Sequence, residues 1–492
     1  MIFADAAIPM AVSLTITILL LKIAHGICKN TDKSALYVSG FLVFFYYYGA
    51  FVSALGYFIA TTDQSPILPA VLWMLAGCLG FIFVYRLKAV AAVATSFLNF
   101  TALVLLVLNL LVIGDYFWTS DSEKHEFTMN PETSASLANL PDIYYLVIDG
   151  YACDKILKSL YGMETNELTD FLKNNNFYIP SASRSNYMQT SLSLASTLNM
   201  SYLDHLAGEY QNQNTAAPLM NMVRNNSVMS YFKGAGYKTV AFASGYATTE
   251  FDQADLYHGK TMINREVYHI LLNNTVLAAF RFNIFDFVAT QVQAHDRLIK
   301  SVVEGLAGLE IADTSPPVFV FAHLPMPHPP FIYNASGELK LVQPRGFHFG
   351  DGNHWGQPQD YRREYIEQLI PLNRLLIKAL SGILAKGNRK KIIIIQADHG
   401  PGSLLNWEDH NDSWLPERFL ILNAYFFPDG DYSALYDEIS PVNSFGVVFN
   451  KIFNTNIDRL PDKNFFSPWS FRYRFTEVTD VIGQQLDHVP PH

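Results

Sequence analysis

The stretch Lys391-Ile-Ile-Ile-Ile-Gln-Ala-Asp-His-Gly400 decides the fold that the sequence predicts. Four consecutive isoleucines form a β-branched apolar run, which is typical of a strand buried on both faces. The run ends in Asp398 and His399, two residue types that bind metals, and a Gly-Pro-Gly sequence then begins a loop. Ligands of open α/β sheets lie beyond the carboxyl ends of the strands, so the stretch indicates a metal or catalytic site. Read alone, it is equally compatible with a core strand followed by a polar turn.

Similar apolar runs recur between residues 141 and 492 and alternate with helical patterns. One helix is expected over Tyr361–Lys386, where apolar residues step by three and four. Strands that alternate with helices predict an α/β domain with a mostly parallel sheet. The other predicted strands are Ile143–Ile148, Thr239–Phe242, Val318–Phe321 and Phe419–Leu422.

Metal-binding residue types follow three of these predicted strands. Asp149 follows the first, His323 and His328 follow the run that ends at Phe321, and the Asp-His pair follows the isoleucines. One such ending is commonplace. Three would bring two carboxylates and several imidazoles to one edge of the sheet, which is the layout of a metal-assisted site.

A candidate nucleophile lies in the segment Arg184–Asn199, where leucines and an alanine give one side of a short helix. Thr190 or Ser191 would stand at its start. A hydroxyl there meets free backbone N–H groups and the positive end of the helix dipole, which favour phosphate and alkoxide. An ordinary threonine or serine N-cap is the alternative interpretation of this segment.

Residues 1–118 predict a membrane anchor. The chain of 492 residues is 50% hydrophobic and only 16% charged, and its mean hydropathy is positive. A membrane span needs roughly 20 apolar residues. Four spans are expected, and residues 119–140 are expected to be a polar linker. The four apolar segments are Pro9–Leu21 with its flanks, Tyr37–Ala60, Ile67–Val84 and Ala89–Ile113.

Basic residues predict the orientation of this anchor. The first connection carries three lysines and the third carries Arg86 and Lys88, whereas the second, Thr61–Ser65, carries none. The N-terminus and the domain 141–492 are therefore expected outside the cytoplasm.

A net charge of −10 gives no reason to expect a nucleic-acid partner. Three cysteines provide no disulfide framework.

The order of these motifs resembles the alkaline phosphatase superfamily, and within it the membrane-anchored sulfatase-like hydrolase/transferase branch. That branch includes lipoteichoic acid synthase and the phosphoglycerol and phosphoethanolamine transferases. The resemblance covers nearly all of residues 141–460. It is carried by Pro141–Tyr151, Asn186–Ser191, His323–His328, Asp398–Gly400 and Ile439–Phe445.

The resemblance implies a role for each motif residue. Asp149, Asp398 and His399 would bind one divalent cation, Zn²⁺ or Mn²⁺ with Mg²⁺ as a further choice, and the Thr190 hydroxyl would complete the site. Thr190, rather than the adjacent serine, would be the nucleophile. His323 and His328 would contact the transferred phosphate or the leaving group. No convincing ligand set for a second metal emerges, and His354 and His410 are expected to be surface or structural histidines.

The implied activity is transfer of a phospho-substituted head group from a membrane lipid to an envelope glycan or lipid, through a covalent phospho-threonine. The alternatives are a phosphodiesterase or phosphatase that uses water as acceptor, and a non-catalytic, lipid-sensing member of the same fold. The location implied is a bacterial-type inner or plasma membrane, crossed several times, with the catalytic domain periplasmic or extracellular.

The sequence lacks the C/S-x-P-x-R motif from which true sulfatases make formylglycine. Its single exported cysteine also differs from the disulfide-rich lipid A phosphoethanolamine transferases.

Overall fold

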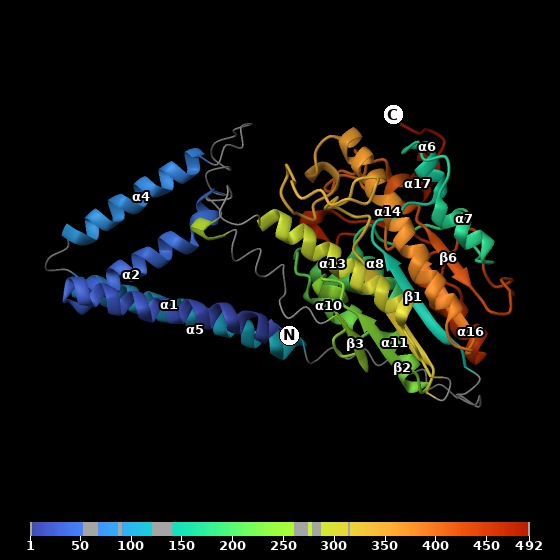
Figure 1. The fold of residues 1–492 in the computed structure, drawn as a ribbon, viewed down its shortest axis with the longest axis horizontal. Helices are drawn as coiled ribbons and strands as arrows, with labels where there is room; N and C mark the ends of the chain where they lie inside the picture. The colour runs from blue at the N-terminus through green and yellow to red at the C-terminus, as the bar shows by residue number, and fades with distance from the viewer. Residues whose placement is uncertain are drawn as a thin grey trace. The chain divides into compact units, whose positions relative to one another are not determined.

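The computed structural model describes residues 2–52, 67–86, 91–120, 140–259, 274–277, 287–312 and 315–490. These residues form two compact units, one made of the N-terminal helices and one that contains the sheet (Figure 1). The predicted linker, residues 119–140, falls almost wholly on positions 121–139, which lie outside the described residues. The domain boundaries therefore stay predictions.

Long apolar helices make up the first unit: α1 (Ile2–Cys28), α2 (Thr31–Tyr46), α4 (Ile67–Arg86) and α5 (Ala91–Ser120). Each overlaps one of the four predicted spans. The part of the second span beyond residue 52 is not among the described residues. The number of membrane crossings stays a prediction.

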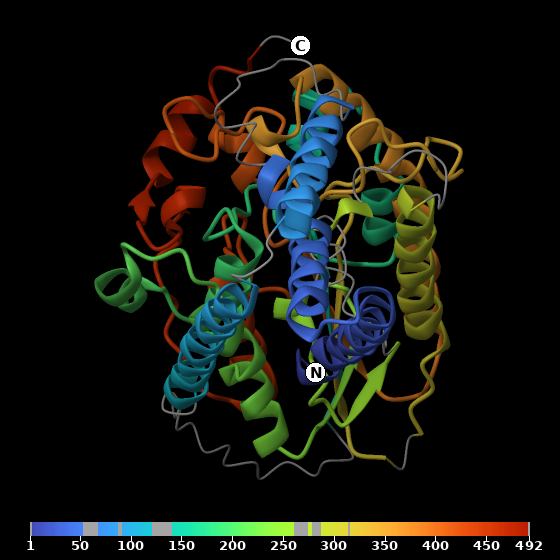
Figure 2. The same ribbon diagram turned by 90° about the vertical axis from the view of Figure 1, so that its left-hand side faces the viewer.

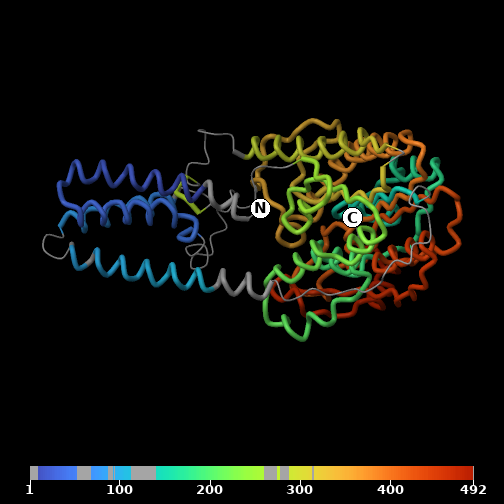
Figure 3. Tube along the Cα trace, turned by 90° about the horizontal axis from the view of Figure 1, so that it is seen from below, coloured from blue at the N-terminus to red at the C-terminus, as the bar shows by residue number. Residues whose placement is uncertain are grey.

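Helix α2 contacts α1, α4 and α5, as the views in Figure 2 and Figure 3 show. The Trp73 indole N–H donates a hydrogen bond to the Phe44 carbonyl at 2.9 Å, and the rings of Tyr37 and Phe81 stack. Most other large apolar side chains of these helices are exposed. Pro9–Cys28 and Leu68–Arg86 are long and apolar enough to cross a membrane. A third segment of that length and composition, Pro358–Ala385, packs in the core of the second unit.

The second unit is built on a six-stranded sheet with the order β3-β2-β4-β1-β5-β6. Every neighbouring pair is parallel except β5 and β6, so the predicted mostly parallel sheet is confirmed. Four predicted strands are confirmed with small extensions, and Tyr361–Lys386 is confirmed as most of α14 (Pro358–Ala385). The strands are β1 (Asp142–Ile148), β2 (Lys238–Phe242), β3 (Leu256–His258), β4 (Val318–Leu324), β5 (Lys391–Gln396) and β6 (Asn423–Phe426).

The predicted strand Phe419–Leu422 is wrong. A short helix, α15 (Leu415–Phe419), forms instead, and Pro416 stands in its first turn, where a helix tolerates proline. Leu420 and Ile421 then make only isolated bridges, and the last strand begins at Asn423. The apolar run is buried as an irregular connection. A buried connection and a buried strand have the same apolar sequence pattern, which explains the wrong prediction.

Alternate residues of the central strands divide the interior into two cores. Tyr144, Leu146 and Ile148 of β1 pack in the first core, and Ile143, Tyr145 and Val147 in the second. The sheet is therefore the middle layer of an α/β/α sandwich. Helices α6 (Asp154–Ser159), α7 (Glu167–Asn174), α13 (Phe287–Gly308), α14 and α17 (Thr479–Gln485) pack on the first face. Helices α8 (Thr190–Asn199), α9 (Asp204–Tyr210), α10 (Ala217–Arg224), α11 (Ser227–Gly234) and α16 (Pro441–Phe453) pack on the second.

The register of the three central strands aligns their carboxyl ends. Ile148 of β1 pairs with Leu324 of β4, and Val147 pairs with Gln396 of β5. The residues that end or follow these strands therefore meet at one edge of the sheet. A small separate hairpin, β7 (Phe465–Phe466) with β8 (Thr476–Glu477), lies apart from this sheet.

Candidate metal centre and active site

Asp149, His323 and Asp398 form a buried group at this edge of the sheet. One ligand atom from each lies within 4.8 Å of the ligand atoms of the other two. Among the described residues, Asp149 Oδ1, His323 Nε2 and Asp398 Oδ2 have no hydrogen-bond partner. Burying an unpaired carboxylate oxygen is costly, so three convergent unpaired atoms are what a divalent cation would satisfy. The donor set of carboxylates and imidazole suits Zn²⁺ or Mn²⁺.

Backbone amides fix the Asp398 carboxylate. Its Oδ1 accepts hydrogen bonds from Gly150 N at 3.1 Å and from His399 N at 2.9 Å. The first of these bonds joins the loop after β1 to the loop after β5. With Oδ1 held in this way, Oδ2 is left pointing at the group, which is a pre-oriented ligand position.

A hydroxyl behind His323 fixes its ring. The residue is the last but one of β4, and strand alternation places it on the face that carries Phe319, Phe321 and α8. His323 Nδ1 lies 2.8 Å from Thr249 Oγ1. The Thr249 hydroxyl has further acceptors for its own proton, so it can accept the Nδ1 proton. The Nε2 lone pair then faces Asp149 Oδ2, 3.5 Å away.

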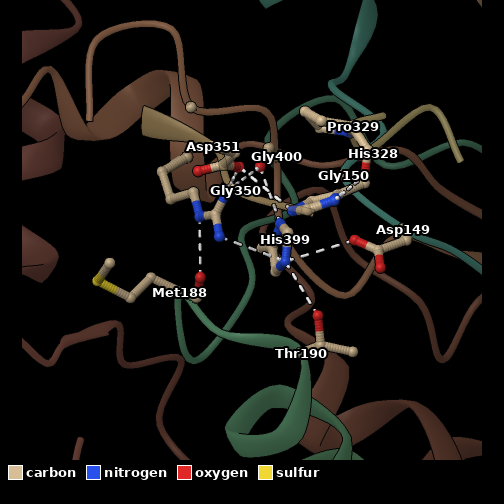
Figure 4. A network of polar contacts seen from close by, with 12 residues as sticks. Asp149, Gly150, Met188, Thr190, His328, Pro329, Gly350, Asp351, His399 and Gly400 are labelled. Carbon is tan, nitrogen blue, oxygen red and sulfur yellow. Dashed lines mark hydrogen bonds and ion pairs between the residues drawn. The ribbon is translucent and has the colours of Figure 1, made fainter. Parts of the chain in front are cut away.

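His399 is held with its other nitrogen toward the same group (Figure 4). Its Nδ1 lies 2.9 Å from the Gly400 carbonyl, which only accepts, so Nδ1 carries the proton and Nε2 the lone pair. Nε2 lies 3.4 Å from Asp398 Oδ2 and 3.5 Å from Asp149 Oδ1. Burial, reinforced by the neighbouring Arg418 guanidinium, lowers the pKa of His399. The ring is therefore neutral at neutral pH, the form in which a histidine can bind a metal.

Thr190 is the first residue of α8, and its Oγ1 lies 3.2 Å from His399 Nε2 (Figure 4). The N-cap residue is Gln189, whose side chain does not cap the helix, so Thr190 is not an ordinary N-cap. The neighbouring Ser191 Oγ instead lies 2.8 Å from the Tyr246 hydroxyl. Of the two hydroxyls, the Thr190 hydroxyl therefore lies beside His399, and the Ser191 hydroxyl does not.

The Asp149 carboxylate is held in its charged form. Burial raises its pKa, but His328, His323 and His399 together outweigh this and hold the pKa of Asp149 well below its ordinary value. A buried, ionised carboxylate with one unpaired oxygen needs a positively charged partner, which a bound cation would supply. This supports the prediction that Asp149 is a metal ligand.

The remaining predicted residues are placed as follows. His323, expected to touch the transferred phosphate, lies among the candidate ligands, which enlarges the predicted set. His328 donates from Nδ1 to the Pro329 carbonyl at 2.9 Å and presents Nε2 to Asp351 Oδ2 at 3.5 Å. His354 and His410 lie against Trp407 and Phe466 respectively, outside the ligand group.

Four residues of the site were not found from the sequence. Thr249 and Tyr246 come from the loop after β2, and Asp351 and Arg418 lie beside His328 and His399. None stands at a predicted strand end or in a motif. Their roles depend on contacts with residues far away along the chain, and no local sequence pattern predicts such contacts.

An α/β/α sandwich with buried carboxylates, imidazoles and a helix-start hydroxyl at its strand ends defines a metal-site hydrolase or transferase class. The sequence model of the sulfatase family matches residues 141–433, more than half of the chain. The chain therefore belongs to the sulfatase family and is a sulfatase-like hydrolase or transferase. This confirms the resemblance to the alkaline phosphatase superfamily.

No curated protein matches the sequence. Among solved structures, the zinc complex of the periplasmic domain of Escherichia coli EptC is 14% identical, with a TM-score of 0.43, and the match covers 70% of this chain and 94% of that one. The corresponding domain of the phosphoethanolamine transferase EptC from Campylobacter jejuni is 14% identical, with a TM-score of 0.39 and coverages of 68% and 94%. Neisseria meningitidis EptA, an integral membrane lipooligosaccharide phosphoethanolamine transferase, is 12% identical, with a TM-score of 0.40 and coverages of 92% and 86%.

Proposed function

We propose that the protein is a metal-dependent transferase that moves a phospho-substituted head group from a membrane lipid to an envelope glycan or lipid, through a covalent intermediate on Thr190. The observation that carries the proposal is the place of the Thr190 hydroxyl at a helix start, 3.2 Å from His399 Nε2. That nitrogen in turn lies 3.5 Å from Asp149 Oδ1 and 3.4 Å from Asp398 Oδ2, two buried oxygens that have no hydrogen-bond partner. The family allows transfer or hydrolysis, and the absence of a C/S-x-P-x-R motif disfavours cleavage of a sulfate ester by formylglycine.

The residues that would hold the metal are Asp149, Asp398, His399 and the Thr190 oxygen, with His323 as a further candidate. When bound, a divalent cation lowers the pKa of a coordinated hydroxyl and neutralises charge on phosphoryl oxygens. One cation is proposed, Zn²⁺ or Mn²⁺ in preference to Mg²⁺, because imidazole belongs to the donor set.

The chain itself orients the reaction. The backbone of α8 aims Thr190 Oγ at the ligand group, and the positive helix end favours the oxyanion. Thr190 Oγ gives up its proton and attacks phosphorus in line, and the P–O bond to the lipid alcohol breaks as that alcohol takes up a proton. An acceptor hydroxyl then loses its proton and attacks the same phosphorus, the Thr190 Oγ–P bond breaks, and the Thr190 hydroxyl regains a proton. His328 lies at the rim of the group, with its side chain 13% exposed, where it can contact the leaving or entering oxygen.

The apolar N-terminal helices support a lipid donor. Helices α1 and α4 have the length and composition of membrane spans, and a tethered catalytic unit meets membrane lipid at a high effective concentration. The proposed location is a bacterial-type inner or plasma membrane, with the catalytic unit periplasmic or extracellular. Charge in the connections supports this orientation.

A hydrolase with water as acceptor would use the same intermediate, and a lipid-sensing protein would use none. The discriminating experiment incubates the full-length protein in detergent with Mn²⁺ or Zn²⁺, a chromogenic phosphodiester and a lipid donor. We expect metal-dependent turnover, together with transfer of the head group to an added glycan or lipid acceptor. Fast release to water without a transfer product would favour the hydrolase, and the absence of both metal binding and turnover would contradict the proposal.

A further inference from the structure

The candidate site opens to solvent beside Thr190 and His328. Both residues are partly exposed, whereas the candidate metal ligands around them are buried. A phosphoryl group therefore has to reach the site past these two side chains. The surface around this opening decides what kind of structure can approach the site.

Few large apolar side chains are exposed in the sheet unit, residues 124–260 and 288–492. Six are exposed among its described residues, and four of these lie on two segments that border the opening. Single exposed apolar residues are ordinary on a protein surface, but a concentration of them at one place marks an interaction surface. We name the four side chains the apolar lip: Leu341, Val342, Phe349 and Trp469.

The first segment, Leu341–Phe349, follows the proline-rich loop that holds His328. The Gln343 side chain fastens it to that loop with a hydrogen bond of 3.0 Å to the Phe331 carbonyl. The segment ends two residues before Asp351, whose carboxylate lies 3.5 Å from His328 Nε2 (Figure 4). It therefore borders the opening beside His328.

The second segment carries Trp469 and is tied to the residue that precedes Thr190. Gln189 Nε2 donates to the Ser467 carbonyl at 3.2 Å and to the Ser467 hydroxyl at 3.1 Å. The Trp469 N–H donates to the Trp407 carbonyl at 3.0 Å, and the two indole rings meet edge to face at 5.2 Å. These contacts hold Trp469 beside the Thr190 end of the opening, where its residue is 45% exposed.

An arginine stands beside each part of the apolar lip. The Arg345 side chain is 35% exposed and meets Asp360 and Glu364 only at 3.9 Å. Arg472 lies over the Trp469 ring, 5.5 Å from its centroid. Exposed apolar and aromatic side chains next to arginines are typical of a bilayer interface, where the guanidinium reaches the head groups.

We propose that the apolar lip enters the interface of the lipid bilayer and seats the opening of the site against the membrane surface. The inference rests on the proposed transfer from a membrane lipid. A phospho-substituted head group lies at this interface, so an opening seated there would receive it while the acyl chains stay in the bilayer. A few inserted apolar side chains, with arginine contacts to head groups, suit a shallow and reversible attachment.

A bilayer, rather than a partner protein, is the occupant that the rest of the chain indicates. Helices α1 and α4 have the length and composition of membrane spans, so the sheet unit is tethered within reach of a membrane surface. The two parts of the lip border the opening beside different residues, His328 and Thr190. A partner protein that covered both parts would close the opening, whereas a bilayer that supplies the substrate would not.

A spin label on Val342, which is 83% exposed, tests the contact directly. The label is attached to Val342→Cys in the full-length chain after Cys28 and Cys78 are replaced by serine, since Cys153 is buried. The protein is reconstituted in nanodiscs of phosphatidylethanolamine and phosphatidylglycerol. Power saturation then compares the collisions of the label with oxygen, which concentrates in the bilayer, and with a nickel chelate, which stays in water.

We expect the Val342 label to collide mainly with oxygen. A label at Lys390, an exposed residue directly before β5 at the opposite edge of the sheet, is the control and should collide mainly with the nickel chelate. Equal access of the nickel chelate to both labels would overturn the inference. Low access of both reagents to the Val342 label would indicate a protein contact in place of the bilayer, and would overturn it as well.

Activity gives a second test. The double variant Leu341→Ser with Val342→Ser changes only exposed side chains, so the fold should be kept. We expect the KM for a lipid donor in vesicles to rise about tenfold or more, and kcat/KM for a soluble chromogenic phosphodiester to stay unchanged. The matched control is Leu256→Ser with Val489→Ser, the two exposed apolar residues of the unit that do not belong to the lip, and it should change neither.

An unchanged KM for the lip variant, or an equal rise for the control variant, would contradict the role of the apolar lip. Failure of the proposed function would look different. The parent protein would then show no turnover with either substrate, while the label at Val342 would still report whether the lip lies in the bilayer.

Discussion

The chemistry of the site depends on which hydroxyl stands beside His399. Thr190 Oγ1 lies 3.2 Å from His399 Nε2, whereas the Ser191 hydroxyl turns to Tyr246. The two residues are neighbours in sequence and equal in chemistry. Only the direction of the first turn of α8 separates them, which is why the sequence left the choice open and the family resemblance was needed.

Replacing the two hydroxyls should separate their roles. Thr190→Ala should lower kcat by about 1,000-fold or more, because the covalent intermediate cannot form. Thr190→Ser should retain measurable turnover, and Ser191→Ala should change kcat by less than about tenfold, since its hydroxyl contacts a tyrosine outside the ligand group. Initial rates with a chromogenic phosphodiester measure all three. Equal losses for the two alanine variants would contradict the assignment.

Thr249 should act on the metal through His323. Thr249→Val removes the oxygen that holds His323 Nδ1 at 2.8 Å, so the ring loses its fixed tautomer. We expect metal affinity to fall by about 10- to 100-fold, as is common when a partner behind a histidine ligand is lost. Competition with a metal indicator measures it. Thr248→Val is the matched control, because that hydroxyl faces Ser191 and not the histidine.

At the scale of the element, β5 has the burial that its four isoleucines predict. Ile393 and Ile395 pack in one core, and Ile392 and Ile394 pack in the other. A continuous apolar run was therefore a sufficient signal for the central strands. The sequence predicted the last strand at Phe419–Leu422, directly before the observed β6 strand. That apolar run is buried by loop contacts, which only the complete fold provides.

Substitutions on opposite faces of β5 should be similarly costly. Ile394→Ala and Ile395→Ala each leave a cavity in a different core, so each should destabilise the domain by about 2–5 kcal/mol. Valine at either position should cost about 0.5–1.5 kcal/mol. Thermal unfolding of the full-length protein in detergent, followed by tryptophan fluorescence, measures the change. A silent alanine at either position would show that its face of the strand is not buried.

At the scale of the whole molecule, composition already separated an apolar N-terminal part from an α/β part. The contacts that assemble the site were harder to predict, because 209 residues separate Thr190 from His399 and 67 separate Asp351 from Arg418. Strand ends predicted Asp149 and Asp398 because a parallel sheet aligns them. Arg418 could not be predicted, because its role arises from a loop that returns to the sheet edge.

Removing the N-terminal helices should lower transfer from membrane lipid and leave the cleavage of a soluble phosphodiester intact. Residues 140–492 contain both cores of the sheet unit, which comprises residues 124–260 and 288–492, so they should fold and cleave a soluble chromogenic phosphodiester with metal. Transfer from lipid in vesicles should fall by about 100-fold or more, because the effective concentration of the donor is lost. Parallel assays of the two forms measure this. Unchanged transfer from vesicles would contradict a donor role for membrane lipid.

The central claim is a covalent intermediate on Thr190 that forms when a metal is present. The most direct measurement is peptide mass spectrometry of the full-length protein, quenched in acid during turnover of a lipid or phosphodiester donor with Mn²⁺ or Zn²⁺. The expected result is the phospho-substituted head group on the peptide that contains Thr190, absent after chelation and absent from Thr190→Ala. An adduct on Ser191, or turnover with an unmodified Thr190 peptide at every quench time, would contradict the account.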